Sequence, residues 1–226
     1  MRSHKLFGTA LGLLLLSSTA SATIQLTLQS GSTTIVVNDG GANDSNSGVG
    51  IITYIGAVGH WNFNVTTGYS GSNPIIGLTS FNNLNTLPGT GADALTLEFS
   101  GTDFVLGSAA TFSAAIGGTL GNGHSLTYAT YLNTNNALNA TQTAIGAPLT
   151  FTPGAFSGTT TGGFVSGGQT FSLTEIVTIT ATAKGATSFN ATIDAATPEP
   201  ATMGMLGTVL LFTAGALRRK LHRTVS

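Results

Sequence analysis

Apolar and polar side chains alternate along most of residues 23–197, and this alternation predicts β-strands. Four short runs show it, each with polar residues between the apolar ones: Ile24, Leu26 and Leu28; Trp61, Phe63 and Val65; Leu95, Leu97 and Phe99; Phe189, Ala191 and Ile193. A period of two buries one face of a strand and leaves the other in water. That arrangement is typical of antiparallel sheets.

The longest alternating run covers Thr170 to Ala183. Its apolar face holds Phe171, Leu173, Val177, Ile179 and Ala181, and its polar face holds Thr178, Thr180 and Thr182. Glu175 falls among the apolar residues. We expect a β-bulge near Glu175 to turn its carboxylate outward, or a position at the rim of the sheet to expose it.

Glycine-rich turn signals separate the predicted strands. They are Asn38-Asp39-Gly40-Gly41, Gly117-Gly118, Gly121-Asn122-Gly123 and Gly162-Gly163. No convincing helical period appears before residue 201, and no internal repeat is found. Eight to ten short strands with glycine-rich loops predict one all-β domain over residues 23–197. We expect an antiparallel β-sandwich of jelly-roll or immunoglobulin-like type.

Residues 1–22 have the organisation of a secretory signal peptide. Arg2, His4 and Lys5 precede the short apolar run Leu6–Leu16. Ala20 and Ala22 are the small residues that a signal peptidase requires, so cleavage is expected before Thr23. The alternative is an N-terminal membrane anchor, for which the apolar run is short of the roughly 20 residues that a span needs.

Residues 198–226 form a distinct tail. Pro198-Glu199-Pro200 is followed by an uncharged run, Ala201–Leu217, and then by Arg218, Arg219 and Lys220. The run is just long enough for a transmembrane helix, and the cations predict that its C-terminal end is cytoplasmic. Because proline fixes φ and keeps the preceding residue extended, Pro-Glu-Pro would be presented as extended backbone next to that helix.

The tail resembles the PEP-CTERM sorting domain, from Pro198 to about Arg219. The resemblance implies processing by an exosortase, a membrane enzyme of Gram-negative bacteria that usually make extracellular polysaccharide or biofilm. The alternative is a plain C-terminal anchor with a chance Pro-Glu-Pro. Residues 37–41, 101–104 and 171–175 are more loosely similar to the ectodomains of small PEP-CTERM proteins, which supports the fold more than a function.

Charge is scarce and unevenly distributed. Charged residues make up 7% of the chain and hydrophobic residues 41%. Residues 23–197 contain seven carboxylates and one cation, Lys184, and therefore have a net charge of −6. An acidic domain offers no complement to a phosphate backbone, which argues against a nucleic-acid partner. The absence of cysteine excludes disulfides and thiolate chemistry.

Candidate catalytic groups are few. His60 and His124 are the only histidines outside the ends, and both are expected at the surface. The chain has no Gly-x-Ser-x-Gly motif for a nucleophilic serine. Glu98, Asp103 and Glu175 are candidates for the paired carboxylates of glycoside hydrolysis, but we expect them to be solvated carboxylates on strands and loops. We predict no catalytic residue and no cofactor.

Three groups are candidates for binding. Asp39, Asn43 and Asp44 form an oxygen-rich loop that could hold calcium, although it lacks the EF-hand pattern. The threonine face of the Thr170–Ala183 strand could present hydroxyls to a glycan or to ice. The aromatic candidates for stacking on sugars are Tyr54, Trp61, Tyr69, Tyr128 and Tyr131, with Trp61 expected in the core and Tyr69 in an exposed loop.

These patterns predict an exported, non-enzymatic surface protein. We expect signal peptidase, an exosortase and the membrane as its processing partners, and extracellular polysaccharide as its surroundings. The expected role is structural or adhesive. The alternatives are a carbohydrate-binding module and a secreted hydrolase.

Overall fold

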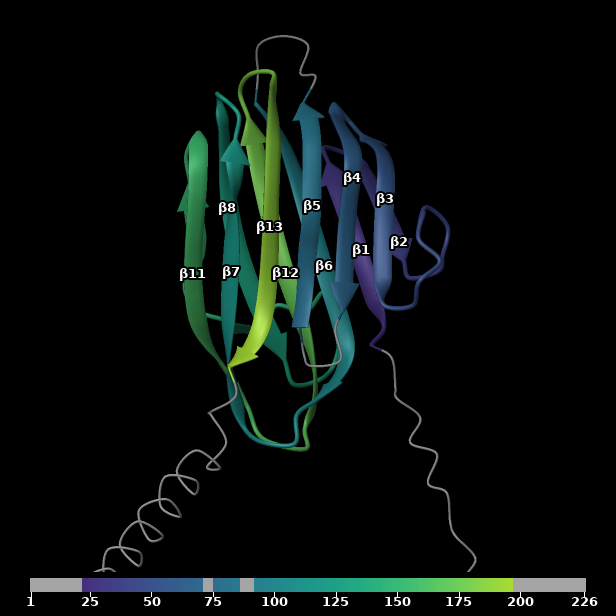
Figure 1. The fold of residues 1–226 in the computed structure, drawn as a ribbon, viewed down its shortest axis with the longest axis vertical. Helices are drawn as coiled ribbons and strands as arrows, with labels where there is room; N and C mark the ends of the chain where they lie inside the picture. The colour runs from purple at the N-terminus through teal and green to yellow at the C-terminus, as the bar shows by residue number, and fades with distance from the viewer. Residues whose placement is uncertain (1–21, 71–74, 86–91, 197–226) are drawn as a thin grey trace, which may run out of the picture.

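The computed structural model describes residues 22–70, 75–85 and 92–196. These residues form thirteen strands and no helix, and the strands lie in two antiparallel sheets (Figure 1). The all-β prediction is confirmed for this part of the chain. The strands are more numerous than the eight to ten expected, and they include two very short ones, β9 and β10.

Sheet A has seven strands. Across the sheet they run β10 (Leu149–Phe151), β8 (His124–Asn133), β12 (Thr170–Ala181), β6 (Asp93–Val105), β1 (Ile24–Ser30) and β2 (Thr33–Asn38), with β9 (Thr143–Ala144) also paired to β8. Sheet B has six strands. They run β11 (Gly154–Val165), β7 (Ala110–Leu120), β13 (Gly185–Ala196), β5 (Ile75–Asn85), β4 (Trp61–Ser70) and β3 (Ile51–Val58).

The chain crosses repeatedly between the two sheets. Strands β5 to β8 are placed in turn in sheet B, sheet A, sheet B and sheet A. Strands β10 to β13 also change sheet, and two of them, β12 and β13, insert between strands of the first set. As a result, β13 lies between β5 and β7, and β12 lies between β6 and β8. Every layer therefore combines residues from distant parts of the sequence.

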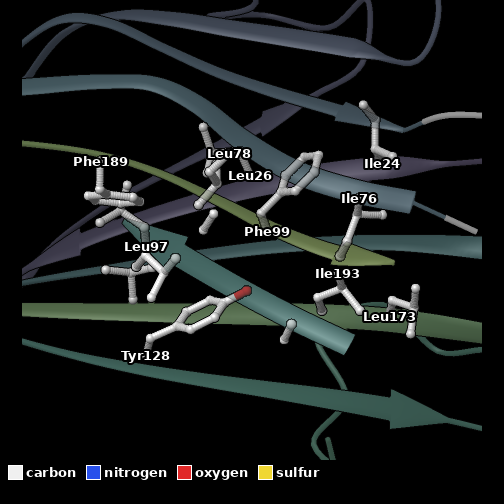
Figure 2. Packing of buried hydrophobic residues seen from close by; sticks show 14 of the residues in the cluster. Ile24, Leu26, Ile76, Leu78, Leu97, Phe99, Tyr128, Leu173, Phe189 and Ile193 are labelled. Atoms are coloured by element: carbon white, nitrogen blue, oxygen red, sulfur yellow. The ribbon is translucent and has the colours of Figure 1, made fainter. Parts of the chain in front are cut away.

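The two sheets enclose one hydrophobic core. The apolar residues that the alternation singled out on β1, β6, β12 and β13 are buried, as are Trp61 and Phe63 on β4. Figure 2 shows Leu26, Leu97 and Phe99 of sheet A packed close to Leu78 and Phe189 of sheet B. On β1, β6, β12 and β13 the inward face is the face that the alternation predicted.

Two predicted turns lie inside strands. Gly117-Gly118 belongs to β7, and Gly162-Gly163 belongs to β11. Gly118 is needed for packing, because a Cβ there would meet the carbonyl oxygen of Ser188 and lie 2.7 Å from the Cα of Phe189. Gly163 has a φ of 64° beside the shift in register between β11 and β7, which is a bulge conformation that suits glycine. The turns at 38–41 and 121–123 are confirmed.

No helix among the described residues is long and apolar enough to span a membrane. The expected signal peptide, residues 1–22, falls outside the described residues except for Ala22, and the sorting tail from residue 198 onward falls outside them as well. The predictions for Ala20, for Pro198, Glu199 and Pro200, and for Arg218, Arg219 and Lys220 therefore stay predictions.

Candidate functional site

The described chain enters and leaves the sandwich at the same end. β1 begins at Ile24 and β13 ends at Ala196, and both ends are at the bottom of Figure 1. Thr23, the expected first residue of the mature chain, already bonds to the sheet, because its carbonyl accepts the N–H of Thr102 at 3.0 Å. The end of β13 is only two residues from Pro198.

A polar cluster joins the sheets at the opposite end. Asp93 accepts a hydrogen bond from Ser30 at 3.1 Å and another from Asn85 at 3.3 Å, and it lies 3.4 Å from Nδ1 of His60. The cluster contains a serine, a histidine and an aspartate, but the aspartate lies between the other two. A nucleophilic serine needs a histidine base beside it, so these contacts supply a structural link rather than an activated hydroxyl.

His124 is buried, so its expected surface position is wrong. Its Nδ1 lies 2.7 Å from the Thr187 hydroxyl and its Nε2 lies 3.2 Å from the Ala183 carbonyl, while its ring meets Trp61 edge-on. With Nε2–H donating to the carbonyl, Nδ1 accepts from Thr187. Burial lowers the pKa of His124, and the Ala183 carbonyl partly opposes that effect.

Glu175 lies inside the core, so neither the expected bulge on its own strand nor the rim position is observed. β12 pairs with β8 without a shift in register. The irregularity lies opposite, on β6, where Asp103 has a φ of 65° and β6 has one more residue than β12 between their paired residues. Because β12 keeps strict alternation, Glu175 must point inward with Leu173 and Val177.

One side chain, Tyr128, bonds to the Glu175 carboxyl. The Tyr128 hydroxyl donates to Oε2 at 3.0 Å, and Oε1 has no hydrogen-bond partner. Figure 2 shows the Tyr128 hydroxyl directed into the core. The pKa of Glu175 is raised to about 8. Burial is the largest cause and Asp194 adds to it, while the bonds from Tyr128 and the Leu78 amide act against this. A carboxyl with such a pKa is mostly protonated at neutral pH, which avoids a buried charge.

Glu98 and Asp103 do not form a catalytic pair with Glu175. Glu98 lies on the outer face of sheet A, half-buried, and burial raises its pKa. Asp103 is exposed at the bulge and accepts the Asn136 side-chain amide at 2.8 Å. Glu175 points to the other face of the same sheet, so the sheet itself separates it from Glu98.

The loop proposed for calcium is organised by its own carboxylates. Asp44 accepts three backbone N–H groups at 2.9 Å, from Gly40, Asn46 and Thr53, and Asp39 accepts that of Gly50 at 2.8 Å. Asn43 has a φ of 70° in the turn between them. Within the described ranges, no three His, Asp or Glu side chains are placed to hold a metal ion.

The threonine face exists and extends beyond β12. Thr178 of β12 pairs with Thr127 of β8 on one side and with Thr96 of β6 on the other. Pairing continues from Thr127 to Thr150 of β10, and from Thr96 to Gln29 of β1 and Thr34 of β2. We call these six residues the threonine row. Thr180 lies two residues further along β12, and Thr182 is exposed just after the strand. Neighbouring strands place these side chains about 4.8 Å apart.

Most of the aromatic candidates are buried and cannot stack on a sugar. Trp61 is buried as predicted, and Tyr54 and Tyr128 are buried as well. Tyr69 lies in β4 rather than in a loop, and its ring covers Gly77, where a Cβ would lie 2.7 Å from Cε1 of the tyrosine. Tyr69 and Tyr131 are half-buried.

Sequence reasoning missed a second polar cluster, which covers part of the outer face of sheet A. The segment after β8 lies over Ser100, Thr174 and Ser172, all of them buried. The Asn139 N–H donates to Ser100 at 3.0 Å, and Ser172 donates to the Ala137 carbonyl at 2.7 Å. The run of asparagines in this segment was the available signal, since asparagine favours such turns.

Comparisons with solved structures find only distant likenesses. They include the enzymatically active domain of tailspike protein 4 from Bacteriophage CBA120 (10% identity, TM-score 0.28, 78% of this chain and 20% of that one). A Podospora anserina GH26-CBM35 beta-(1,4)-mannanase has 15% identity and a TM-score of 0.29, over 67% of this chain and 29% of that one. An Arthrobacter globiformis T6 isomalto-dextranase complexed with panose has 15% identity and a TM-score of 0.26, over 64% and 23%.

This chain spans less than a third of the length of each of these structures, and at such TM-scores the likenesses support no conclusion. The comparison with curated proteins finds no match. Residues 196–220 match the model of the PEP-CTERM protein-sorting motif, which confirms the resemblance of the tail and implies an exosortase as sorting partner. This chain is therefore a protein that carries the PEP-CTERM sorting motif, which indicates that it is exported and sorted to the cell surface.

Proposed function

We propose that this chain is an exosortase-processed surface or extracellular-matrix protein, and that its sandwich has a structural or adhesive, non-enzymatic role in an exopolysaccharide or biofilm layer. The sorting motif at residues 196–220 is the observation on which this proposal depends. The motif begins where β13 ends, at Ala196. Cleavage at Pro-Glu-Pro would therefore release a sandwich with all of its strands.

Four polar groups of the described part support a non-enzymatic role, because each has a structural place. Asp93 links the sheets, Asp44 organises a loop, His124 is enclosed beside Trp61, and Glu175 is sealed in the core. A hydrolase would need a nucleophile, a base and access for substrate in one place. Asp44 and Glu175 lie apart from the other two. Asp93 and His124 both pair with Ala181 of β12 from neighbouring strands, but their side chains bond to different residues.

The intact mass of the protein from its native host tests this proposal, measured with and without the exosortase. A chain that starts at Thr23 and ends near Pro198 only when the enzyme is present is the expected result. Extra mass would reveal a glycan or an attached carrier. A chain that ends at Ser226 in both strains would show that the tail is a plain anchor and would remove the main support for a matrix role.

A carbohydrate-binding module is the second candidate, and the threonine row favours it. The row lies on a part of sheet A whose outer face carries hydroxyls and amides, with Glu98 as the nearest carboxylate. The interleaved order of β5–β8 and β10–β13 is the order of a jelly roll, an architecture that lectins use among many others. Fold alone does not assign a ligand.

Co-sedimentation with the host's own polysaccharide tests this second candidate. Replacing Thr127 and Thr178 by lysine should abolish retention if the row is the binding surface. The same change at Thr111, exposed on sheet B, is the matched control. Retention that is absent in the wild type, or lost equally in the control, would remove the candidate.

A further inference from the structure

Charge is absent from one side of the sandwich. No Asp, Glu, Lys or Arg occurs between Phe104 and Thr174, a stretch of 71 residues that contains β7, β8, β9, β10 and β11. All seven carboxylates of residues 23–197 lie outside it. A net charge of −6 normally keeps copies of a domain apart, but here that repulsion is weakest at the β10–β11 edge, on the left of Figure 1.

Exposed sheet edges pair with other chains unless something prevents it. Three of the four edges have such a feature. β3 is bulged between Tyr54 and Gly56, and the preceding loop covers it: Asp44 accepts the Thr53 N–H, and the Ser45 N–H donates to the Thr53 carbonyl at 2.8 Å.

The other two protected edges are both in sheet A. β10 has only three residues and lies between Pro148 and Pro153. β2 has six residues and leads directly into the loop that carries Asp39 and Asp44. Short strands, prolines and nearby carboxylates all discourage pairing between copies.

β11 has none of these protections from Gly154 to Thr159, whereas Gly146 of the loop before β10 lies beside Thr160, Thr161 and Gly162. It has twelve residues with no charge and no proline, and its pairing with β7 is regular from Gly154 to Gly162. In the described part of the chain no strand pairs with its other side. A regular strand of this kind exposes a row of N–H and C=O groups that can bond to another strand.

The same edge carries incompletely buried apolar side chains. Phe156 of β11 packs against Phe151 of β10 with ring centroids 4.6 Å apart, and both are half-buried, as is Leu149. Phe164 near the end of β11 is 62% exposed. A neighbour on this edge would remove part of this apolar surface from water, which favours association.

We propose that a second copy of this chain docks on β11, through antiparallel β11–β11 pairing about a two-fold axis that continues sheet B from one copy into the other. A contact of this kind is self-complementary. It aligns the outward side chains Ser157, Thr159 and Thr161 of one copy with the same set of the other. Such cross-strand threonine pairs stabilise sheets.

The size of the contact predicts its strength. Nine regular residues extend about 30 Å, and a sandwich edge is roughly 20 Å wide with side chains, which gives about 600 Å² per copy. That area is at the lower limit of specific interfaces, so we expect dissociation in the micromolar range. The proposal goes beyond sorting to the surface and does not depend on the tail, because it concerns only the folded sandwich.

The molecular mass of the exported chain in solution, measured across a dilution series, tests the proposal. The wild-type chain should form dimers that dissociate on dilution. The double variant Thr159→Lys, Thr161→Lys should be monomeric throughout, since it places like charges opposite one another. The matched control is Thr34→Lys on the β2 edge, which should still form dimers.

A wild-type chain that stays monomeric at about 1 mM would overturn the proposal, since a micromolar contact would then be saturated. A dimer that is lost in Thr34→Lys but kept in the double variant would also overturn the proposal, because it would show that the contact is made by β2. Fluorescence of Trp61, the single tryptophan, verifies that each variant is folded.

Cysteine crosslinking gives a second, geometric measurement, because the natural chain has no cysteine. Three variants each carry one cysteine, at Ser157, Thr159 or Thr161. At least one of them should form a disulfide-linked dimer on mild oxidation, because residues near a two-fold axis come within disulfide range of their copies. A cysteine at Thr34 should not. Crosslinking at Thr34 alone, or at none of the four positions, would contradict the β11 contact.

Discussion

At the residue scale, the least expected feature is a carboxyl group with no exposed surface. Glu175 points into the core between two sheets, with Tyr128 as the donor to one oxygen and no partner for the other. Protonation removes most of the cost of burying it, and this is the physical meaning of its raised pKa. The group therefore links folding to pH.

The sign of that linkage predicts lower stability at higher pH. Between about pH 4.5 and about pH 8 the unfolded chain releases the Glu175 proton and the folded chain keeps it. The contribution of Glu175 to the free energy of unfolding should thus fall with rising pH across this window, by on the order of 1 kcal/mol per pH unit.

Replacing Glu175 by Gln isolates this effect from that of His124, whose lowered pKa acts on the acidic side. The variant should match the wild type near pH 5 and become the more stable of the two as the pH rises to about 8. Urea unfolding at a series of pH values measures the difference. A constant difference across that range would mean that Glu175 is not protonated in the folded chain.

Gly118 allows two strands to approach closely. A Cβ at Gly118 would meet the Ser188 carbonyl, whereas at the neighbouring Gly117 the nearest atom would be 3.5 Å away, an ordinary contact. We expect Gly118→Ala to lower the free energy of unfolding by roughly 1–3 kcal/mol. Gly117→Ala should be close to neutral in the same denaturation measurement, and equal losses in both would refute this reading.

At the element scale, the loop between β2 and β3 shows how a carboxylate can organise backbone. Asp44 satisfies the N–H groups of Gly40, Asn46 and Thr53, and in doing so covers part of the β3 edge. These bonds provide a structural reason for the acidic residues that suggested calcium. They also tie the loop to the sheet that follows it.

Replacing Asp44 by Ala should therefore destabilise the chain without calcium. We expect a loss of roughly 1–3 kcal/mol, because three amides lose a charged acceptor. The melting temperature of the wild type should be the same in calcium and in a chelator. A calcium-dependent rise in the wild type that disappears in Asp44→Ala would instead establish the loop as a calcium site.

At the scale of the whole molecule, the two sheets share one core and their strands are interleaved along the chain. Neither sheet contains a contiguous half of the sequence. Removing one would expose the inner face of the other, so we expect both to unfold together.

Unfolding should therefore be a single transition. Trp61 reports on sheet B and on its contact with His124 of sheet A, while far-ultraviolet circular dichroism reports on all strands. The two signals should coincide in a urea titration. Separate midpoints would show that the sheets are independent units.

The sequence by itself determined which face of the clearly alternating strands is buried, because alternation with a period of two is a local property. It also identified the sorting tail, whose residues are contiguous. Tertiary structure decided the features that depend on a partner strand: the inward Glu175, the burial of His124 against Thr187, and the glycines of β7 and β11 that belong to strands instead of turns. It also decided which edges stay open, because β11 becomes an edge only when the order of all the strands is fixed.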